Sequence, residues 1–363
     1  MTTGGDSAAF ATVRRLLDEG AGPIYPGAVA CVMDAGQVRL LHAVGRVPPG
    51  PTRPDTQYDL ASLTKPIATL TLAADLLTSG ALGLGDRLRD VLPCSVGDAT
   101  VAEALGHATG LPAHRDLSSA DGPDALRAAV LSEAPLAPPG TRTIYSDLGY
   151  MALGFYLEAR FGAPLDALVA PALARLGLAG LHYRRDTGDP ADRERYAPTD
   201  AGSGYGPDAS PRPVGSSDER RGAVHDANAA ALGGVAAHAG LFGDALSVAR
   251  WADRLLAEHA ARSPFGRTLD VLWTTGAGRD ASTWRLGLDT PSPGGSTAGH
   301  PPPGALGHLG YTGTSVWMVP ARRWTVVLLS NRVHGRPDAE TATAMRRLRP
   351  GFHDAVWAAL GNR

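Results

Sequence analysis

Lysine occurs only once in this chain. Of the 34 Lys and Arg residues, Lys65 alone carries an amine. Arginine supplies surface charge as well as lysine does, but a guanidinium cannot be deprotonated inside a protein. Lys65 lies within residues 59–77, DLASLTKPIATLTLAADLL, which are apolar nearly all round and predict a buried helix. The chain must therefore fold so that its one amine is buried, which favours a chemical role over a chance position on a solvated face.

Ser62 precedes this amine by three residues. At that spacing in a helix two side chains share one face, so the amine can reach the hydroxyl. A serine hydroxyl is a weak nucleophile until a neighbouring base takes its proton. Pro66 is consistent with a helix that begins here, and the positive end of that helix would favour an oxyanion near Ser62. We predict Ser62 as the nucleophile of an acyl transfer and Lys65 as its essential amine.

Strand patterns gather toward the two ends of the chain. Residues 7–20 have helical spacing, and residues 27–45 predict two strands around an Asp34-Ala35-Gly36 turn. After residue 230, two β-rich runs at 306–320 and 322–334 are joined by a short turn, and residues 350–363 predict a closing helix. The two ends are therefore expected to build one α/β unit.

The middle of the chain alternates helical pieces with Gly/Pro loops. We predict an α/β (α+β) sandwich whose antiparallel sheet is flanked by N- and C-terminal helices. Residues 1–79 and 230–363 would form the sandwich domain, residues 80–229 an inserted helical domain, and the site would lie in the cleft between them. Residues 201–222 are too polar and too rich in Gly and Pro for regular structure, and a loop of that length is usually a lid or disordered.

Two further motifs follow the serine and lysine in the sequence. Residues 145–147 are Tyr-Ser-Asp, and residues 308–310 are His-Leu-Gly. With these three boxes, S-x-x-K, Y-x-N or a variant, and K-T-G or H-x-G, the chain resembles the serine β-lactamase and penicillin-binding-protein superfamily, in its class C-like branch of esterases and hydrolases. Further matching stretches are residues 107–112, 194–200, 224–242 and 307–320.

The resemblance implies a role for each box. Ser62 would become acylated, Lys65 would assist its deprotonation, and Tyr145 would be the general base that passes the proton to the leaving group. A phenol needs a lowered pKa for this, and a nearby ammonium would supply it. The resemblance also implies an oxyanion hole formed by the backbone N–H groups of Ser62 and Tyr311.

The chain departs from the β-lactamase pattern at two positions. Asp147 stands where β-lactamases carry asparagine, and we expect its carboxylate to hold Lys65 protonated, which moves the base role toward Tyr145. His308, in the box that Gly310 closes, stands where β-lactamases place the lysine that holds the substrate carboxylate. Because a neutral imidazole is a weaker anchor for anions, we expect esters or amides without a free carboxylate rather than anionic β-lactams.

Three functions follow from these boxes. The first is a hydrolase that cleaves a small-molecule ester or amide through an acyl-enzyme on Ser62. The second is a transacylase that moves the acyl group to an amine or alcohol in a biosynthetic pathway. The third is a binding or sensor protein that is acylated once and stops, and the three boxes count against it because a pure sensor needs no deacylation base.

Composition limits the location and the partners that we expect for this protein. The formal net charge of −2 gives no bulk field for nucleic acid or an anionic membrane. The first ten residues have neither the basic nor the apolar region of a secretory signal, and no apolar run approaches the 18 or so residues that cross a bilayer. We therefore expect a cytoplasmic protein without nucleic-acid or membrane partners; the oligomeric state is left open.

No cofactor or metal is expected. Walker, dinucleotide and H-E-x-x-H motifs are absent from the sequence. His225, Asp226 and His238 have a spacing that matches no zinc pattern. Cys31 and Cys94 lie among apolar residues, and we expect both in the core.

Four more residues near these motifs have alternative roles. Trp284 and Trp317 are expected either to line an acyl pocket or to pack in the core. Ser146 would either polarise Lys65 or have a packing role. His107 is expected to organise a loop rather than to bind a ligand.

Overall fold

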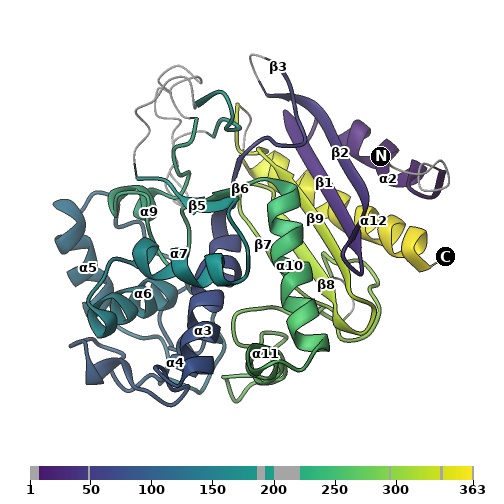
Figure 1. Cartoon of the computed structure of the whole chain (residues 1–363). Helices are drawn as coiled ribbons and strands as arrows, with labels where there is room; N and C mark the ends of the chain where they lie inside the picture. Colours follow the sequence, from purple (N-terminus) through teal and green to yellow (C-terminus); the bar gives the residue numbers. More distant parts are fainter. Residues whose placement is uncertain are drawn as a thin grey trace.

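A six-stranded antiparallel sheet forms one half of the molecule (Figure 1). The computed structural model describes residues 8–47, 50–185, 193–199, 221–293, 296–335 and 338–361. The strand order is β3-β2-β1-β9-β8-β7, so the first long strand pairs with the last, with Cys31 opposite Val327. The strands are β1 (Gly27–Asp34), β2 (Gln37–Val47), β3 (Gly50–Pro51), β7 (Leu306–Leu309), β8 (Ser315–Val319) and β9 (Trp324–Ser330). Both ends of the chain therefore build this sheet, as predicted.

Local sequence explains the first hairpin. Between β1 and β2, Ala35 and Gly36 both have positive φ, of 47° and 85°. Two consecutive left-handed residues match the right-handed twist of the strands they join. The expected Asp34-Ala35-Gly36 turn is confirmed.

Helices cover both faces of the sheet. Alternate residues of β1 point to opposite sides: Val29 and Cys31 belong to the same hydrophobic cluster as Trp251 of α10, whereas Ala30 belongs to the cluster that contains Phe352 of α12. The covering helices are α10 (Ala245–Ala260) and α11 (Pro264–Thr274) on one side, and α2 (Ala11–Gly20) and α12 (Asp338–Gly361) on the other. The predicted flanking by terminal helices is confirmed, and α12 begins twelve residues earlier than residue 350.

The second half of the molecule is mostly helical. Its helices are α4 (Val101–Leu105), α5 (Gly122–Ser132), α6 (Asp147–Phe161), α7 (Leu165–Arg175) and α9 (Ala227–Ala231). A small sheet of β4 (Tyr58–Asp59), β6 (Leu241–Gly243) and β5 (Leu181–Tyr183) joins three distant parts of the chain. We propose residues 80–229 as an inserted domain and 1–79 with 230–363 as the other. Residues 201–220 of the loop predicted at 201–222 lie outside the described residues.

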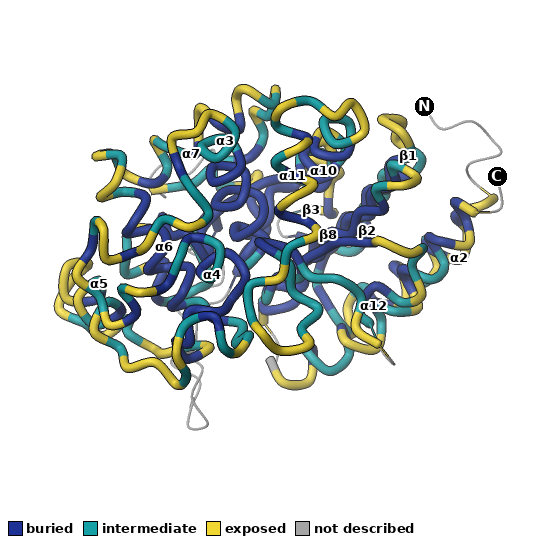
Figure 2. Tube along the Cα trace, turned by 90° about the horizontal axis from the view of Figure 1, so that it is seen from below, coloured by how far each residue is buried: buried dark blue, intermediate teal, exposed yellow. Residues whose placement is uncertain are grey.

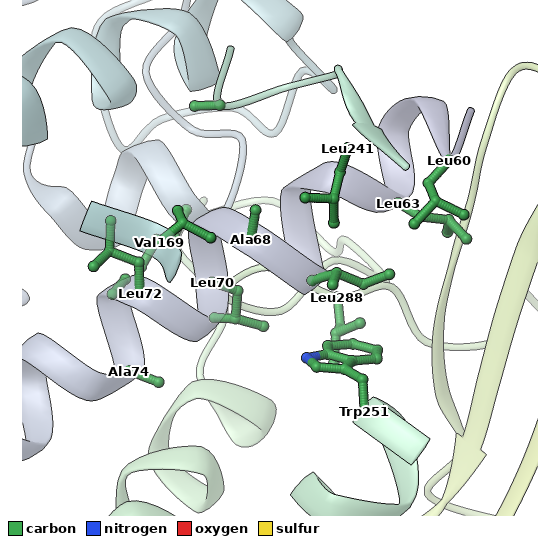
Figure 3. Close-up of a cluster of buried hydrophobic side chains, with 14 of the residues drawn as sticks. Leu60, Leu63, Ala68, Leu70, Leu72, Ala74, Val169, Leu241, Trp251 and Leu288 are labelled. Carbon is green, nitrogen blue, oxygen red and sulfur yellow. The ribbon is translucent and has the colours of Figure 1, made fainter. Parts of the chain in front are cut away.

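The segment that carries Ser62 and Lys65 lies between the two halves. The buried helix predicted within residues 59–77 is present, but it is built from the 3₁₀ turn η1 (Ala61–Leu63), the π-helical η2 (Lys65–Leu70) and the α-helix α3 (Thr71–Ser79). π-helical turns are rare and often mark functional sites. Figure 3 shows apolar side chains of this segment, among them Leu70 and Leu72, between Val169 of α7 and Trp251 of α10.

One hydrophobic core runs through this segment into both halves. Figure 2 shows the buried residues along the middle of the molecule and the exposed ones on the outer turns of α2, α5 and α12. Cys31 is fully buried as expected, whereas Cys94 is only partly buried at the edge of the core. Within the described ranges, no helix combines the length and the apolar character needed to cross a bilayer.

Candidate active site

A cavity of ≈ 410 Å³ lies where the edge strand β7 faces the helical half. It brings together residues from all three sequence boxes. Lys65 lies beneath it, with no exposed surface. The residues of the predicted site that line the cavity are Ser62, Tyr145, Asp147, His308, Gly310 and Tyr311.

The ammonium of Lys65 is held by three hydrogen bonds. Its Nζ donates to Ser62 Oγ at 3.2 Å, to Asp147 Oδ1 at 2.6 Å and to the backbone oxygen of His238 at 3.3 Å. These partners match the three donors of an ammonium. Burial lowers the pKa of Lys65, but the carboxylate of Asp147 and the phenol of Tyr145 outweigh it and raise the pKa to about 12. The geometry agrees with the expectation that Asp147 keeps the amine protonated.

Asp147 is placed by the start of α6. Ser146, the residue before it, accepts a hydrogen bond from the N–H of Gly149 and donates from Oγ to the backbone oxygen of Pro112, so it caps the helix. These contacts favour the packing role of Ser146. Burial raises the pKa of Asp147, but the Lys65 ammonium outweighs it and holds that pKa well below its usual range.

His114 is a second partner of this carboxylate that sequence reasoning missed. Its Nδ1 lies 3.6 Å from Asp147 Oδ2, and its ring is partly exposed. Burial lowers the pKa of His114, but the interaction with Asp147 raises it overall. The signal in the sequence was its place two residues beyond the stretch 107–112.

Tyr145 does not have the lowered pKa that we expected. Burial raises its pKa most, the ammonium of Lys65 lowers it, and the carboxylate of Asp147 raises it again. The net pKa is raised, so the expectation of a net lowering is wrong. The ammonium acts in the predicted direction, but the removal of the phenol from water is the larger effect.

Aromatic rings hold the phenol in place. The centroid of the Tyr145 ring lies 4.5 Å from that of His107 and 5.1 Å from that of Trp284. His107 Nδ1 accepts a hydrogen bond from the N–H of Ser146, which agrees with the expected loop-organising role. Trp284 lines the cavity, whereas Trp317 both lines it and packs in the core. Both alternatives that we gave for the tryptophans are therefore realised.

His308 provides a neutral group in the cavity wall. It lies on β7, and its Nδ1 donates to the backbone oxygen of Leu309 at 2.7 Å, because a carbonyl can only accept. Its Nε2 is then an acceptor, and it has no hydrogen-bond partner among the residues that the structure describes. Burial and the nearby Lys65 ammonium lower the pKa of His308 to about 3. The imidazole is therefore neutral, as expected.

The turn between β7 and β8 carries Gly310 and Tyr311. Gly310 donates its N–H to the backbone oxygen of Thr314 at 2.8 Å. A Cβ on Gly310 would lie 2.7 Å from the backbone oxygen of Leu60, so only glycine allows this close approach to the segment before Ser62. The ring of Tyr311 lies under the guanidinium of Arg332, 4.7 Å from its Cζ.

Backbone strain is found directly before Ser62. Ala61 has a φ of 48°, which is unusual for a residue with a Cβ. Its N–H donates to Asp59 Oδ1 at 2.8 Å, and this buried carboxylate also accepts from the N–H of His225. Such strained residues persist where surrounding contacts hold them, often at functional sites.

The histidines that were weighed as metal ligands have other partners. His238 Nε2 lies 3.0 Å from Asp226 Oδ1, and the ring of His225 lies beside that of Tyr311, 5.6 Å between centroids. In the described part of the chain, no three side chains of His, Cys, Asp or Glu gather as a metal ion would require.

The antiparallel sheet, the helical half beside it and the three boxes around one cavity define the class of β-lactamase-fold serine hydrolases. Residues 13–349 match the Beta-lactamase family model, and the chain belongs to this family. A relative from Escherichia coli K12, named provisionally as a D-alanyl-D-alanine carboxypeptidase, is 30% identical over 311 residues, which cover 77% of this chain and 70% of that protein.

Solved structures show the same fold. EstCE1, described as a hydrolase with promiscuous acyltransferase activity, matches with a TM-score of 0.73 at 21% identity, over 98% of this chain and 100% of that one. A class C β-lactamase matches with a TM-score of 0.69 at 18% identity, over 99% of each chain. The predicted superfamily and fold are thereby confirmed.

Proposed function

We propose that this protein cleaves small-molecule esters or amides through an acyl-enzyme on Ser62. The observation that carries the proposal is the contact of 3.2 Å between Lys65 Nζ and Ser62 Oγ, at the floor of a cavity large enough for a small substrate. In the reaction Ser62 Oγ bonds to the carbonyl carbon, and the bond from that carbon to the leaving group breaks. A water oxygen then bonds to the acyl carbon, the bond from that carbon to Ser62 Oγ breaks, and the acid is released.

The protonation states of the residues around Ser62 support Tyr145 as the base. Lys65 is an ammonium with its three donors engaged, and Asp147 is committed to that ammonium. His308 Nε2 is an acceptor, but the low pKa of that ring makes it a poor base. Tyr145, in contact with both Ser62 and Lys65, would take the serine proton as a phenolate and give it to the leaving group. Lys65 would stabilise that phenolate.

Neutral substrates fit the wall that His308 forms. An uncharged imidazole supplies no charge to pair with a substrate carboxylate, so we propose esters or amides without one as the preferred class. Turnover of penicillins or cephalosporins faster than that of simple esters would overturn this preference.

One residue favours a second candidate, a carboxypeptidase acting on a peptide with a free C-terminus. Arg346 on α12 also lines the cavity, and its guanidinium donates to Thr343 Oγ1 at 3.2 Å. The E. coli relative carries a carboxypeptidase name. Release of D-alanine from an acyl-D-alanyl-D-alanine peptide, lost in Arg346→Ala, would select this function over the esterase.

The acyl acceptor separates hydrolysis from transfer. EstCE1 has the same fold and is described as an acyltransferase as well as a hydrolase. Adding amines or alcohols during ester turnover tests this alternative, because a transacylase forms amide or ester product in competition with the free acid.

The central test is intact mass after reaction with p-nitrophenyl butyrate and, separately, with a fluorophosphonate. We expect a covalent adduct and repeated release of nitrophenol from the wild type, and neither from Ser62→Ala. One equivalent of nitrophenol followed by no further release would identify the sensor function. The absence of any adduct on the wild type would refute the acyl-enzyme.

A further inference from the structure

The two N–H groups of the proposed oxyanion hole come from segments far apart in sequence. Ser62 follows the strained Ala61, and Tyr311 lies in the turn after β7. An oxyanion hole needs both donors within about 2.7–3.1 Å of one developing charge, so the distance between these segments must be fixed. The β-ladders do not fix it, because the strand before Ser62 and β7 belong to different sheets.

Two threonine hydroxyls connect these two segments. Thr312 Oγ1 donates to the backbone oxygen of Asp59 at 2.8 Å, and Thr314 Oγ1 donates to that of Leu60 at 3.1 Å. Both threonines are buried, with 1% and 0% of their surface exposed. Their acceptors lie three and two residues before Ser62. The hydroxyls therefore tie the turn that carries Tyr311 to the backbone that leads into the nucleophile.

Each side of this link is rigid by itself. On the turn side, Arg349 Nη2 donates to the backbone oxygens of Gly310 at 3.3 Å and Thr314 at 2.7 Å. On the nucleophile side, the Asp59 carboxylate holds the N–H of Ala61. The two hydroxyl bonds of Thr312 and Thr314 join these two held backbones directly.

We infer that Thr312 and Thr314 are positioning residues that set the separation of the two oxyanion donors. The inference rests on the proposed acyl-enzyme function and deepens it. Valine has nearly the shape of threonine, but it removes the hydroxyl that donates to the opposite carbonyl and with it the tie. Serine keeps the donor and loses only a methyl group. The pair of substitutions therefore separates the hydrogen bond from packing.

The test compares an ester with its thionoester in Thr312→Val, Thr314→Val and the matching serine variants. Sulfur accepts hydrogen bonds weakly, so an intact oxyanion hole favours the ester over the thionoester. We expect each valine variant to lower kcat/KM for the ester about 10- to 100-fold and for the thionoester much less, with KM nearly unchanged. The serine variants should restore the ester-to-thionoester ratio.

Thr78→Val is the matched control. It removes a hydroxyl that joins α3 to Thr268 of α11 at 2.9 Å, away from the cavity, and the ratio should not change. A ratio unchanged in both valine variants, or serine variants as defective as valine ones, would overturn the inference. If circular dichroism shows that one valine variant is unfolded, the ester-to-thionoester ratio of the other valine variant tests the inference. Failure of the wild type to acylate would instead refute the proposed function.

Discussion

The two walls that face Ser62 are built from different chemistry. Behind the serine, Lys65 and Asp147 form a buried pair of opposite charges. Elsewhere on the cavity wall, His308 is neutral, the turn after β7 offers backbone dipoles, and the Arg349 guanidinium there is bonded to two carbonyls of that turn. Charges can hold or move a proton, whereas fixed dipoles stabilise an oxyanion without changing protonation. The comparison assigns proton transfer to the charged wall and transition-state stabilisation to the neutral one.

Removal of the amine should produce the largest effect. Lys65→Ala leaves Asp147 as a buried charge without its ammonium and removes the donor to Ser62, so kcat/KM for p-nitrophenyl butyrate should fall on the order of 10⁴-fold. Lys65→Arg should not restore activity, because the larger guanidinium does not fit a site with no exposed surface. An arginine variant with more than about a tenth of wild-type activity would contradict this assignment.

Loss of the phenol hydroxyl should come next. Tyr145→Phe removes the proposed base but keeps the ring against His107 and Trp284, and we expect a loss of about 10²- to 10⁴-fold in the acylation rate. Tyr150→Phe is the matched control, since its buried hydroxyl donates to the backbone oxygen of Leu105. Stopped-flow release of nitrophenol measures both, and equal losses in the two variants would mean that Tyr145 is only structural.

Neutralising Asp147 should change the pH dependence. The pKa of Tyr145 is raised, so its phenolate fraction grows as pH rises, and wild-type kcat/KM should still be rising at about pH 9. Asp147 raises the pKa of both Lys65 and Tyr145, so Asp147→Asn should lower both.

The rising limb of the Asp147→Asn profile should therefore move to lower pH by about one unit or more. Asp289→Asn, which removes another acid from the cavity wall, should leave the limb in place. An Asp147→Asn profile that overlays the wild type would show that the carboxylate does not control the base.

Substitution of His308 should give the smallest loss of kcat/KM. Burial holds the pKa of His308 at about 3, so this ring has no charge to lose across the working pH range. We expect His308→Asn to lower kcat/KM by about tenfold or less and to leave the shape of the profile from about pH 5 to 9 unchanged. A new limb or the loss of one in that variant would show that His308 titrates during catalysis.

Local patterns in the sequence predicted much of the fold. The hairpin at residues 34–36 depends on backbone preferences of adjacent residues, and the burial of Lys65 follows from its apolar neighbours. The flanking helices follow from spacing of apolar residues. The winding of η2 was not predictable in this way, because packing from both halves of the molecule acts on it.

The sequence by itself predicted which chemical groups meet at the cavity, since spacing paired Ser62 with Lys65 and the resemblance to a known superfamily added Tyr145. Only the tertiary structure decided the protonation of Tyr145 and the alignment of the three groups. The raised pKa of Tyr145 results from burial, and the ammonium of Lys65 is held by a carboxylate 82 residues away along the chain. Desolvation and through-space contacts of this kind depend on distances that no local pattern encodes.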